Sequence, residues 1–375
     1  MNRFKIYLIL SSNDWSFAKS KISYIKKNIA SYEIVIVSSG KLQTEDLLGC
    51  SFLNEDEILK DSYGLSFSAV RDYLMELNAM PENAGWYLQQ FIKLGISKIS
   101  HDEYYLVWDA DTIPLNKIDF FDKKGKPYFN LKREYFEVYF RTIDNLFGLK
   151  KQENESFISE HMLFKTSVVR EMLEKIESNE SLGGKFFWQK ILHGSDLLQK
   201  DFIKKDQRFF SEFETYGTYC AAFYPNLYSY RKLRTLRHGV DFLGENPSDE
   251  ILAWAGKDFD TISFEKWGKP ISEMISLSEN PLHRTKISFA DTIRFFFKKE
   301  RRKIFAKFPK IDHEQFRHFF ENTIAKTNFD FFFGKKLAYS KRHLYFEDSL
   351  LKKFRFLYVT RCRIQRYWRL FTFHF

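Results

Sequence analysis

The segment that determines the fold prediction is Asp102-Glu103-Tyr104-Tyr105-Leu106-Val107-Trp108-Asp109-Ala110-Asp111-Thr112-Ile113-Pro114-Leu115. Residues 104–108 form a continuous apolar run, which is typical of a strand buried on both faces. The run ends at two acids, Asp109 and Asp111, which share a face of an extended chain because they are two residues apart. Their repulsion requires a cation. Carboxylate oxygens suit Mg²⁺ or Mn²⁺, so we expect one of these ions here, together with substrate phosphates.

The segments around this strand alternate between strand and helix patterns. Residues 4–10 have the pattern of a strand, residues 15–29 that of a helix and residues 33–37 that of a second strand. This order is typical of an α/β sheet. Ligands of open α/β folds bind in the loops at the carboxyl ends of the strands. Ser11 and Asp14 lie in the first such loop and are candidate donor-binding residues. Other helices are predicted over 66–77, 85–99, 167–178, 247–254 and much of 185–220, with extended chain over 128–131 and 224–236.

Four stretches of the chain resemble a known class of enzyme. The string Trp108–Leu115 resembles the D-x-D segment of GT-A glycosyltransferases. Residues 85–94, 159–164 and 211–217 are similar to segments of bacterial glycosyltransferase-like proteins without assigned substrates, and the resemblance covers roughly residues 1–270. It implies a Rossmann-like GT-A fold and a nucleoside-diphosphate sugar as donor. Asp109 and Asp111 would then hold the metal beside the donor diphosphate, and we expect a glycan or lipid-linked glycan as acceptor. Asp109 is also a candidate contact to the donor ribose.

The helix before the central strand carries three polar residues within one turn. Gln89, Gln90 and Lys93 are close enough in sequence for at least two of them to share a face. They are candidates to contact the donor diphosphate or to line the cleft. The alternative is an exposed polar face.

Candidates for the catalytic base lie in two other segments. Ser211 and Glu214 fit an N-terminal capping box, which leaves Glu212 at the positive end of a helix. By resemblance, many GT-A enzymes place a catalytic acid residue at a comparable helix start, which supports Glu212 or Glu214. Glu160 and His161, at the entry to an apolar run, compete for that role, and His161 has a purely structural reading as well.

Arg237 and His238 follow the extended segment 224–236. By resemblance, GT-A enzymes often bring a late histidine to the metal and basic residues to the diphosphate. His238 is therefore a candidate third metal ligand, and Arg237 a candidate diphosphate contact. The alternative is a histidine in a turn made possible by Gly239.

Charge is distributed unevenly along the 375 residues. Residues 283–375 hold 23 Lys and Arg against 8 Asp and Glu, a net charge of +15, so that residues 1–282 carry −5 of the total of +10. We therefore expect two domains, a catalytic domain over 1–282 and a basic, aromatic, mainly helical extension over 283–375. Such an asymmetry indicates an anionic partner for the extension.

The extension combines aromatic and basic residues in the segments 295–305 and 352–375. This composition is typical of a segment that lies on an anionic membrane surface. The same composition would also suit RNA binding, although no nucleic-acid module is recognisable. A third alternative is a helical bundle or a homo-oligomer interface with a Phe-rich core.

Several features of the sequence concern its location. The three cysteines, Cys50, Cys220 and Cys362, are scattered and odd in number, which favours a reducing compartment. The apolar N-terminal run is interrupted by Lys5 and lacks a cleavage site, so a first strand is the better interpretation than a signal peptide. No stretch approaches the roughly 18 apolar residues of a membrane span. We expect a cytoplasmic protein, peripheral on the inner face of the cytoplasmic membrane.

Two alternatives to sugar transfer are compatible with parts of the sequence. A nucleotidyltransferase also uses paired acids on an α/β sheet, but usually has a Gly-rich, basic loop after its first strand, where this chain has Ser11-Ser12-Asn13-Asp14. A non-enzymatic protein that binds membrane or nucleic acid would make the acidic pair incidental.

Overall fold

A computed structural model describes residues 3–42, 45–195, 197, 208–266 and 268–307 of the chain. The chain forms two compact units, Met1–Leu233 and Arg234–Phe375. The sequence predicts a boundary at residue 282, which falls within the second unit. Residues 234–282 join the later helices because their apolar side chains pack together: the Trp254 ring lies 4.9 Å from that of Phe289, and Phe242 lies 6.0 Å from Phe297.

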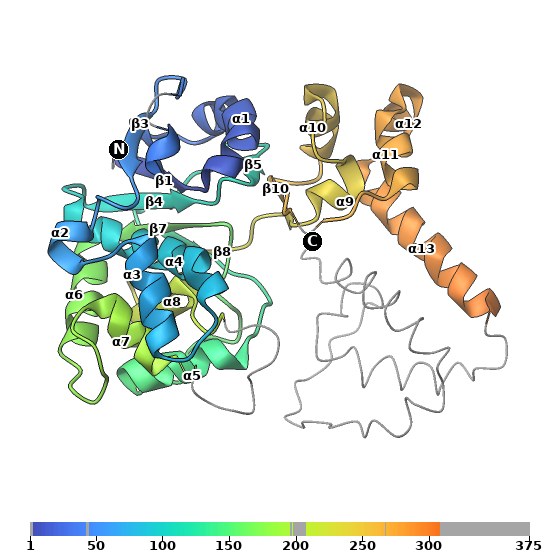
Figure 1. The fold of residues 1–375 in the computed structure, drawn as a ribbon. Helices are drawn as coiled ribbons and strands as arrows, with labels where there is room; N and C mark the ends of the chain where they lie inside the picture. The colour runs from blue at the N-terminus through green and yellow to red at the C-terminus, as the bar shows by residue number, and fades with distance from the viewer. Residues whose placement is uncertain (1–2, 43–44, 196, 198–207, 267, 308–375) are drawn as a thin grey trace. The chain divides into compact units, whose positions relative to one another are not determined.

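The first unit is built on a five-stranded sheet with the order β3-β2-β1-β4-β7 (Figure 1). Strands β1 to β4 are parallel to their neighbours, and β7 is antiparallel to β4. The strands are β1 (Phe4–Ile9), β2 (Glu33–Ser38), β3 (Ser51–Asn54), β4 (Tyr104–Trp108) and β7 (His161–Lys165). This parallel-rich sheet flanked by helices confirms the predicted α/β class.

The central strands β1, β2 and β4 are largely apolar because both faces of the sheet are covered. In β4, Tyr105 and Val107 belong to one buried cluster, whereas Leu106 and Trp108 belong to another on the opposite face. The alternation follows from the period of two residues in a strand. One face meets α1 (Trp15–Asn28), and the other meets helices that include α4 (Ala84–Ile99).

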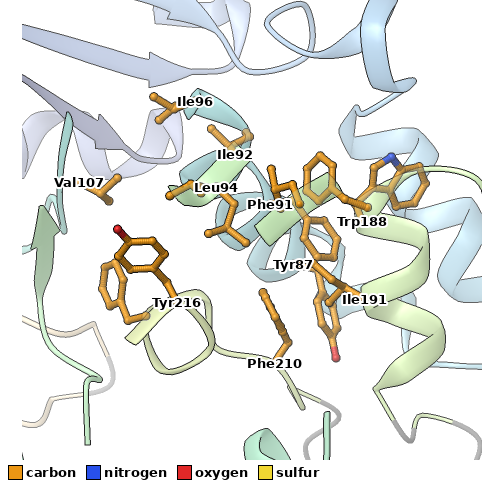
Figure 2. Packing of buried hydrophobic residues seen from close by; sticks show 14 of the residues in the cluster. Tyr87, Phe91, Ile92, Leu94, Ile96, Val107, Trp188, Ile191, Phe210 and Tyr216 are labelled. Atoms are coloured by element: carbon orange, nitrogen blue, oxygen red, sulfur yellow. The ribbon is translucent and has the colours of Figure 1, made fainter. Parts of the chain in front are cut away.

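The larger cluster is dominated by aromatic side chains, which accounts for part of the high Phe content. Tyr87 and Phe91 of α4 pack near Trp188 and Ile191, and Phe210 lies in the same core (Figure 2). The helices on this side are α2 (Lys60–Tyr63), α3 (Phe67–Glu76), α5 (Glu137–Phe147), α6 (Thr166–Glu177), α7 (Phe187–Gly194) and α8 (Glu212–Phe223).

The segment 224–236 is less regular than the sequence predicts. The predicted extended segment 224–236 contains only β8 (Ser229–Arg231) and β9 (Thr235–Leu236) as strands. Strand β8 pairs in parallel with β6 (Tyr128–Asn130), so this second sheet is small. A short strand, β5 (Thr112–Pro114), follows the two acids.

The second unit is mainly helical in its described part. Strand β10 (Thr261–Ser263) pairs in parallel with β9. The helices are α9 (Gly239–Leu243), α10 (Asp249–Ala255), α11 (Ser272–Glu279), α12 (Pro281–Lys286) and α13 (Phe289–Lys307). The basic segment 352–375 and Cys362 lie outside the described residues. Within the described residues, no helix combines the length and the apolar character that crossing a membrane requires.

Candidate active site

The predicted site residues of the first unit gather at one edge of the sheet. Strands β1 and β4 are parallel neighbours, with Tyr7 opposite Val107, so the loops after both strands emerge side by side. Because β7 is antiparallel to β4, its first residue, His161, pairs with Trp108 at the same edge. The sheet topology therefore brings together Ser11 and Asp14, Asp109 and Asp111, and Glu160 and His161, which come from three separate parts of the sequence.

A tight turn fixes the backbone around the two aspartates. The Asp109 N–H donates to the Glu160 carbonyl (2.9 Å), and the Asp109 carbonyl accepts from the Thr112 N–H (3.0 Å). The Trp108 indole N–H donates to the Thr112 carbonyl (2.8 Å), and the Thr112 hydroxyl donates to the Asp111 carboxylate (3.2 Å). The positions of both aspartates thus follow from buried residues beside them.

One buried lysine joins Asp109 to a distant helix. Lys93 Nζ lies 2.9 Å from Asp109 Oδ1 and 2.8 Å from Glu212 Oε1, where Glu212 is the first residue of α8. With its amide oriented so that the nitrogen faces the carboxylate, Gln90 also donates to Glu212. We call Lys93, Gln90, Asp109 and Glu212 the Lys93 cluster. The sequence grouped Gln90 and Lys93 correctly on one helix face, but that face is buried and not an exposed polar surface.

The electrostatics of the Lys93 cluster favour a charged lysine. Only 4% of Lys93 and 2% of Glu212 is exposed. Burial alone would lower the pKa of Lys93, but the adjacent Asp109 and Glu212 carboxylates outweigh it and raise that pKa above its usual value. The ammonium also lies 4.5 Å from the centre of the Phe213 ring, a favourable cation–π distance.

A second buried lysine–glutamate pair lies next to the Asp109 backbone. Lys132 donates to Glu160, and 3% of the lysine and 4% of the glutamate is exposed. We call these two residues the Lys132 pair. Its contact with Asp109 is through the Glu160 backbone carbonyl rather than through a side chain. The Glu160 carboxylate, a candidate base, is thus bound by an ammonium.

Glu214 does not complete the predicted capping box. Ser211 does cap α8, since its hydroxyl accepts from the Glu214 N–H (3.3 Å). The Glu214 carboxylate, however, accepts from the Ser156 hydroxyl (2.5 Å) and the Phe157 N–H (3.1 Å). Phe157 can lie against α8 because Gly217 has no side chain: a Cβ there would come within 2.1 Å of the Phe157 ring. Burial raises the pKa of Glu214.

His161 is packed between aromatic rings. Its imidazole stacks on Trp108 with 4.8 Å between centroids, and the edge of Phe120 lies 5.5 Å away. Burial, together with Arg231 and Lys132, lowers the pKa of His161 to about 3, so the ring is neutral at physiological pH. Neither ring nitrogen has a hydrogen-bond partner in the described part of the chain. This environment resembles that of a structural histidine.

The loop after β1 holds the remaining donor candidates of the first unit. The Ser11 hydroxyl donates to the Asp14 carboxylate (2.5 Å). Gln89 donates its side-chain amide to the carbonyl of Ile9, the last residue of β1 (3.0 Å). Gln89 therefore supports the strand end next to Asp109, whereas Gln90, its neighbour, belongs to the Lys93 cluster.

The donor set of this edge fits a hard divalent cation. Asp109 and Asp111 bring two carboxylates to this edge, and Lys93 bonds one oxygen of Asp109. All the ligand atoms on offer are carboxylate oxygens, which Mg²⁺ and Mn²⁺ prefer. Mg²⁺ typically binds through one or two protein carboxylates together with phosphates and water. Within the described residues, no group of three or more His, Cys, Asp or Glu is placed to hold a metal.

A family model matches the part of the chain that contains this edge. It describes a family of unknown function, DUF6492, and matches residues 6–237. The chain belongs to this family. The matched range includes Asp109, Asp111, the Lys93 cluster and the Lys132 pair, and it ends one residue before His238. No curated protein matches the chain.

Several solved structures are similar to the chain at low sequence identity. The apo form of mouse xyloside xylosyltransferase 1 shares 12% identity, covers 72% of this chain and 100% of its own, and has a TM-score of 0.35. Galactosyltransferase LgtC with donor and acceptor sugar analogues shares 11% identity, over 70% of this chain and 87% of its own, with a TM-score of 0.32. The apo form of glycosyltransferase GlyE from Streptococcus pneumoniae TIGR4 shares 10% identity, covers 80% of this chain and 64% of its own, and has a TM-score of 0.33.

The last two predicted site residues belong to the second unit. Arg237 Nε lies 2.8 Å from Glu265 Oε1, and His238 Nδ1 lies 3.1 Å from Asp241 Oδ2. His238 is buried at the start of α9. Its predicted role as a metal ligand and that of Arg237 as a diphosphate contact stay predictions.

Sequence reasoning missed Lys132 and Ser156, which bind two of the candidate bases. One signal was available for Lys132, because it follows the short strand β6 in the same way that the aspartates follow β4. No local pattern distinguishes Ser156, whose partner Glu214 is 58 residues away in the sequence.

Proposed function

We propose that this chain is a metal-dependent glycosyltransferase that moves a sugar from a nucleoside-diphosphate donor to a glycan or lipid-linked glycan. The observation that carries the proposal is the position of Asp109 and Asp111 at the carboxyl end of β4, with Asp109 bound into the buried Lys93 cluster. The resemblance of residues 108–115 to a D-x-D segment supports the same reading. Ligands of open α/β sheets bind at this edge.

On the donor side, Asp109 and Asp111 would hold Mn²⁺ or Mg²⁺. When bound, such an ion supplies positive charge that stabilises a departing nucleoside diphosphate. Ser11, Asp14 and Gln89 surround the end of the neighbouring strand β1 and would line the donor site. Asp14 is held by Ser11, which orients its carboxylate before any donor arrives.

On the acceptor side, the side-chain contacts of the three candidate glutamates distinguish their roles. A base must be ionised in order to take the proton of an acceptor hydroxyl. Burial raises the pKa of Glu212 above its usual value although the adjacent Lys93 favours the ionised form, and a raised pKa suits a general base. Glu212 is also joined to Asp109 by the same ammonium. The Glu160 and Glu214 carboxylates support other segments through Lys132 and Ser156. We therefore assign positioning roles to Glu160 and Glu214, and retain Glu212 as the candidate base.

We further propose that the second unit meets an anionic membrane surface, where a lipid-linked acceptor would be found in surface polysaccharide synthesis. Helix α13 buries Ile293, Phe296 and Phe297, while Phe295 is 57% exposed beside the exposed Lys298 and Lys299. An exposed ring next to cations suits the headgroup region of an anionic membrane.

Thermal-shift measurements with nucleoside diphosphates test the proposed reaction. UDP, GDP, ADP and CDP are each added with Mn²⁺ or with EDTA. We expect at least one nucleotide to raise the melting temperature, and to do so more in Mn²⁺. If no nucleotide stabilises the protein under either condition, the proposed function is wrong.

A further inference from the structure

Lys93 occupies an unusual position for a residue that sequence reasoning assigns to the donor diphosphate. Only 4% of the residue is exposed, and its ammonium already contacts two carboxylates, at 2.9 and 2.8 Å. Both contacts are charge-assisted hydrogen bonds, the stronger kind in proteins. A diphosphate could reach Lys93 only by displacing Asp109 or Glu212.

We propose that Lys93 is a positioning residue that fixes Asp109 in the orientation in which it binds the divalent cation, and that Glu212 in turn fixes Lys93. This inference rests on the proposed function, because it concerns the cation of the same site. Lys93 bonds the Oδ1 oxygen of Asp109, so Oδ2 is the oxygen that would bind the ion, together with Asp111. Gln90 completes the arrangement by donating to Glu212.

Three features of the geometry support this role. The Asp109 backbone is fixed on both sides, by the Glu160 carbonyl and the Thr112 N–H, so rotation of the side chain is the freedom that remains. Lys93 removes that freedom from the α4 side. The Tyr105 hydroxyl donates to the Lys93 carbonyl (3.0 Å), so the helix that carries the lysine is itself tied to β4, the strand that carries Asp109.

A charge-neutral double substitution separates positioning from electrostatic effects. The variant Lys93→Met with Glu212→Gln removes one positive and one negative charge, so the net charge around Asp109 and Asp111 is unchanged. Loss of groups that orient a metal ligand typically weakens metal binding about 10- to 100-fold. We expect the dissociation constant for Mn²⁺ to rise by about that factor in this variant.

The matched control is the Lys132 pair, changed in the same way to Lys132→Met with Glu160→Gln. Both pairs are buried to the same degree, but only Lys93 bonds the Asp109 side chain. We expect the control to change the Mn²⁺ dissociation constant by no more than about 2-fold, an effect within the usual error of independent sites. Free Mn²⁺ is measured by electron paramagnetic resonance, with the ion alone and with UDP or GDP, and circular dichroism verifies folding.

Each outcome supports or overturns the inference. Weak Mn²⁺ binding by the Lys93 double variant alone supports it. Wild-type affinity in that variant, or equal losses in both variants, overturns it and leaves the proposed function standing. Absence of Mn²⁺ binding by the wild type under all conditions overturns both the inference and the metal-dependent function. If the first double variant does not fold, Lys93→Gln with Glu212→Gln provides the same comparison with a milder change.

Discussion

Two buried lysine–glutamate pairs lie next to Asp109, and they differ in which groups the lysine contacts. Lys93 bonds Glu212 and also Asp109, whereas Lys132 bonds Glu160 and comes to Asp109 only through the Glu160 backbone. Buried ion pairs contribute little net stability, since desolvation offsets much of the attraction. A buried ion pair does hold its two side chains in defined positions. We infer from this comparison that the Lys93–Glu212 pair positions the Asp109 side chain, whereas the Lys132–Glu160 pair positions a segment of backbone.

The largest expected effect follows from removing the carboxylate of Asp111, the second of the two proposed metal ligands. In the variant Asp111→Asn, nucleotide-dependent turnover in Mn²⁺ should fall by on the order of 100-fold or more, because the ion loses a ligand. The matched control is Asp119→Asn, an exposed aspartate in the same region. Equal activity of Asp111→Asn and the control would remove Asp111 from the site.

The next effect compares the two pairs directly through stability. Lys93→Met and Lys132→Met each leave a buried carboxylate without its ammonium, which costs about 3 to 5 kcal/mol of unfolding free energy. Adding Glu212→Gln or Glu160→Gln to the matching variant should restore part of that loss, because the unpaired charge is removed. Urea denaturation measures all four variants. A loss in only one of the two single variants would show that the pairs are not energetically equivalent.

His161, beside the Lys132 pair, predicts a pH dependence of stability in the acid range. Its folded pKa of about 3 lies below the value of 6.5 for an ordinary histidine. The unfolded chain therefore binds a proton that the folded chain excludes, so stability present above pH 6.5 is lost progressively as the pH falls toward 3. Between pH 7 and pH 5 the loss from this group is about 2 kcal/mol.

Urea denaturation at both pH values checks this, with His161→Phe as the comparison. The phenylalanine keeps a ring against Trp108 and cannot be protonated, so the difference between pH 7 and pH 5 should shrink by that amount. An unchanged difference would mean that His161 is accessible to protons in the folded protein.

The smallest expected effect concerns the start of α8, where Glu212 lies. Ser211→Ala removes the helix cap and should cost about 1 kcal/mol of unfolding free energy. Because Lys93 and Gln90 hold Glu212 independently, Mn²⁺ binding should stay near the wild-type value. A large loss of Mn²⁺ affinity in this variant would show that the cap, and not Lys93, positions Glu212.

The elements around the aspartates could be predicted from the sequence because their patterns are local. The apolar run before Asp109 is strand β4, and the helix expected over 85–99 is α4 from Ala84 to Ile99. The short strand β3 has no comparable signal, since Ser51–Asn54 is only half-buried at the edge of the sheet. Strands and helices with a regular apolar pattern and deep burial can thus be predicted from the sequence, whereas a short, half-buried edge strand cannot.

The residues of the candidate site could be nominated from the sequence, whereas the contacts between them could not. The aspartates, Gln90, Lys93 and Glu212 were all nominated from local patterns, yet the ion pair between Lys93 and Glu212 joins residues 119 positions apart. Such a pairing depends on how α4 and α8 pack, which no local pattern specifies. For the same reason, Glu214 was assigned to a capping box although it bonds Ser156.

The measurement that tests the central claim most directly is release of nucleoside diphosphate from a panel of nucleotide sugars. The wild-type chain is compared with Asp111→Asn, each in Mn²⁺ and in EDTA. We predict release from at least one nucleotide sugar by the wild type in Mn²⁺, with little release in EDTA or by the variant. Release that is equal in the wild type and Asp111→Asn, or no release from any member of the panel together with no nucleotide binding, would contradict the account.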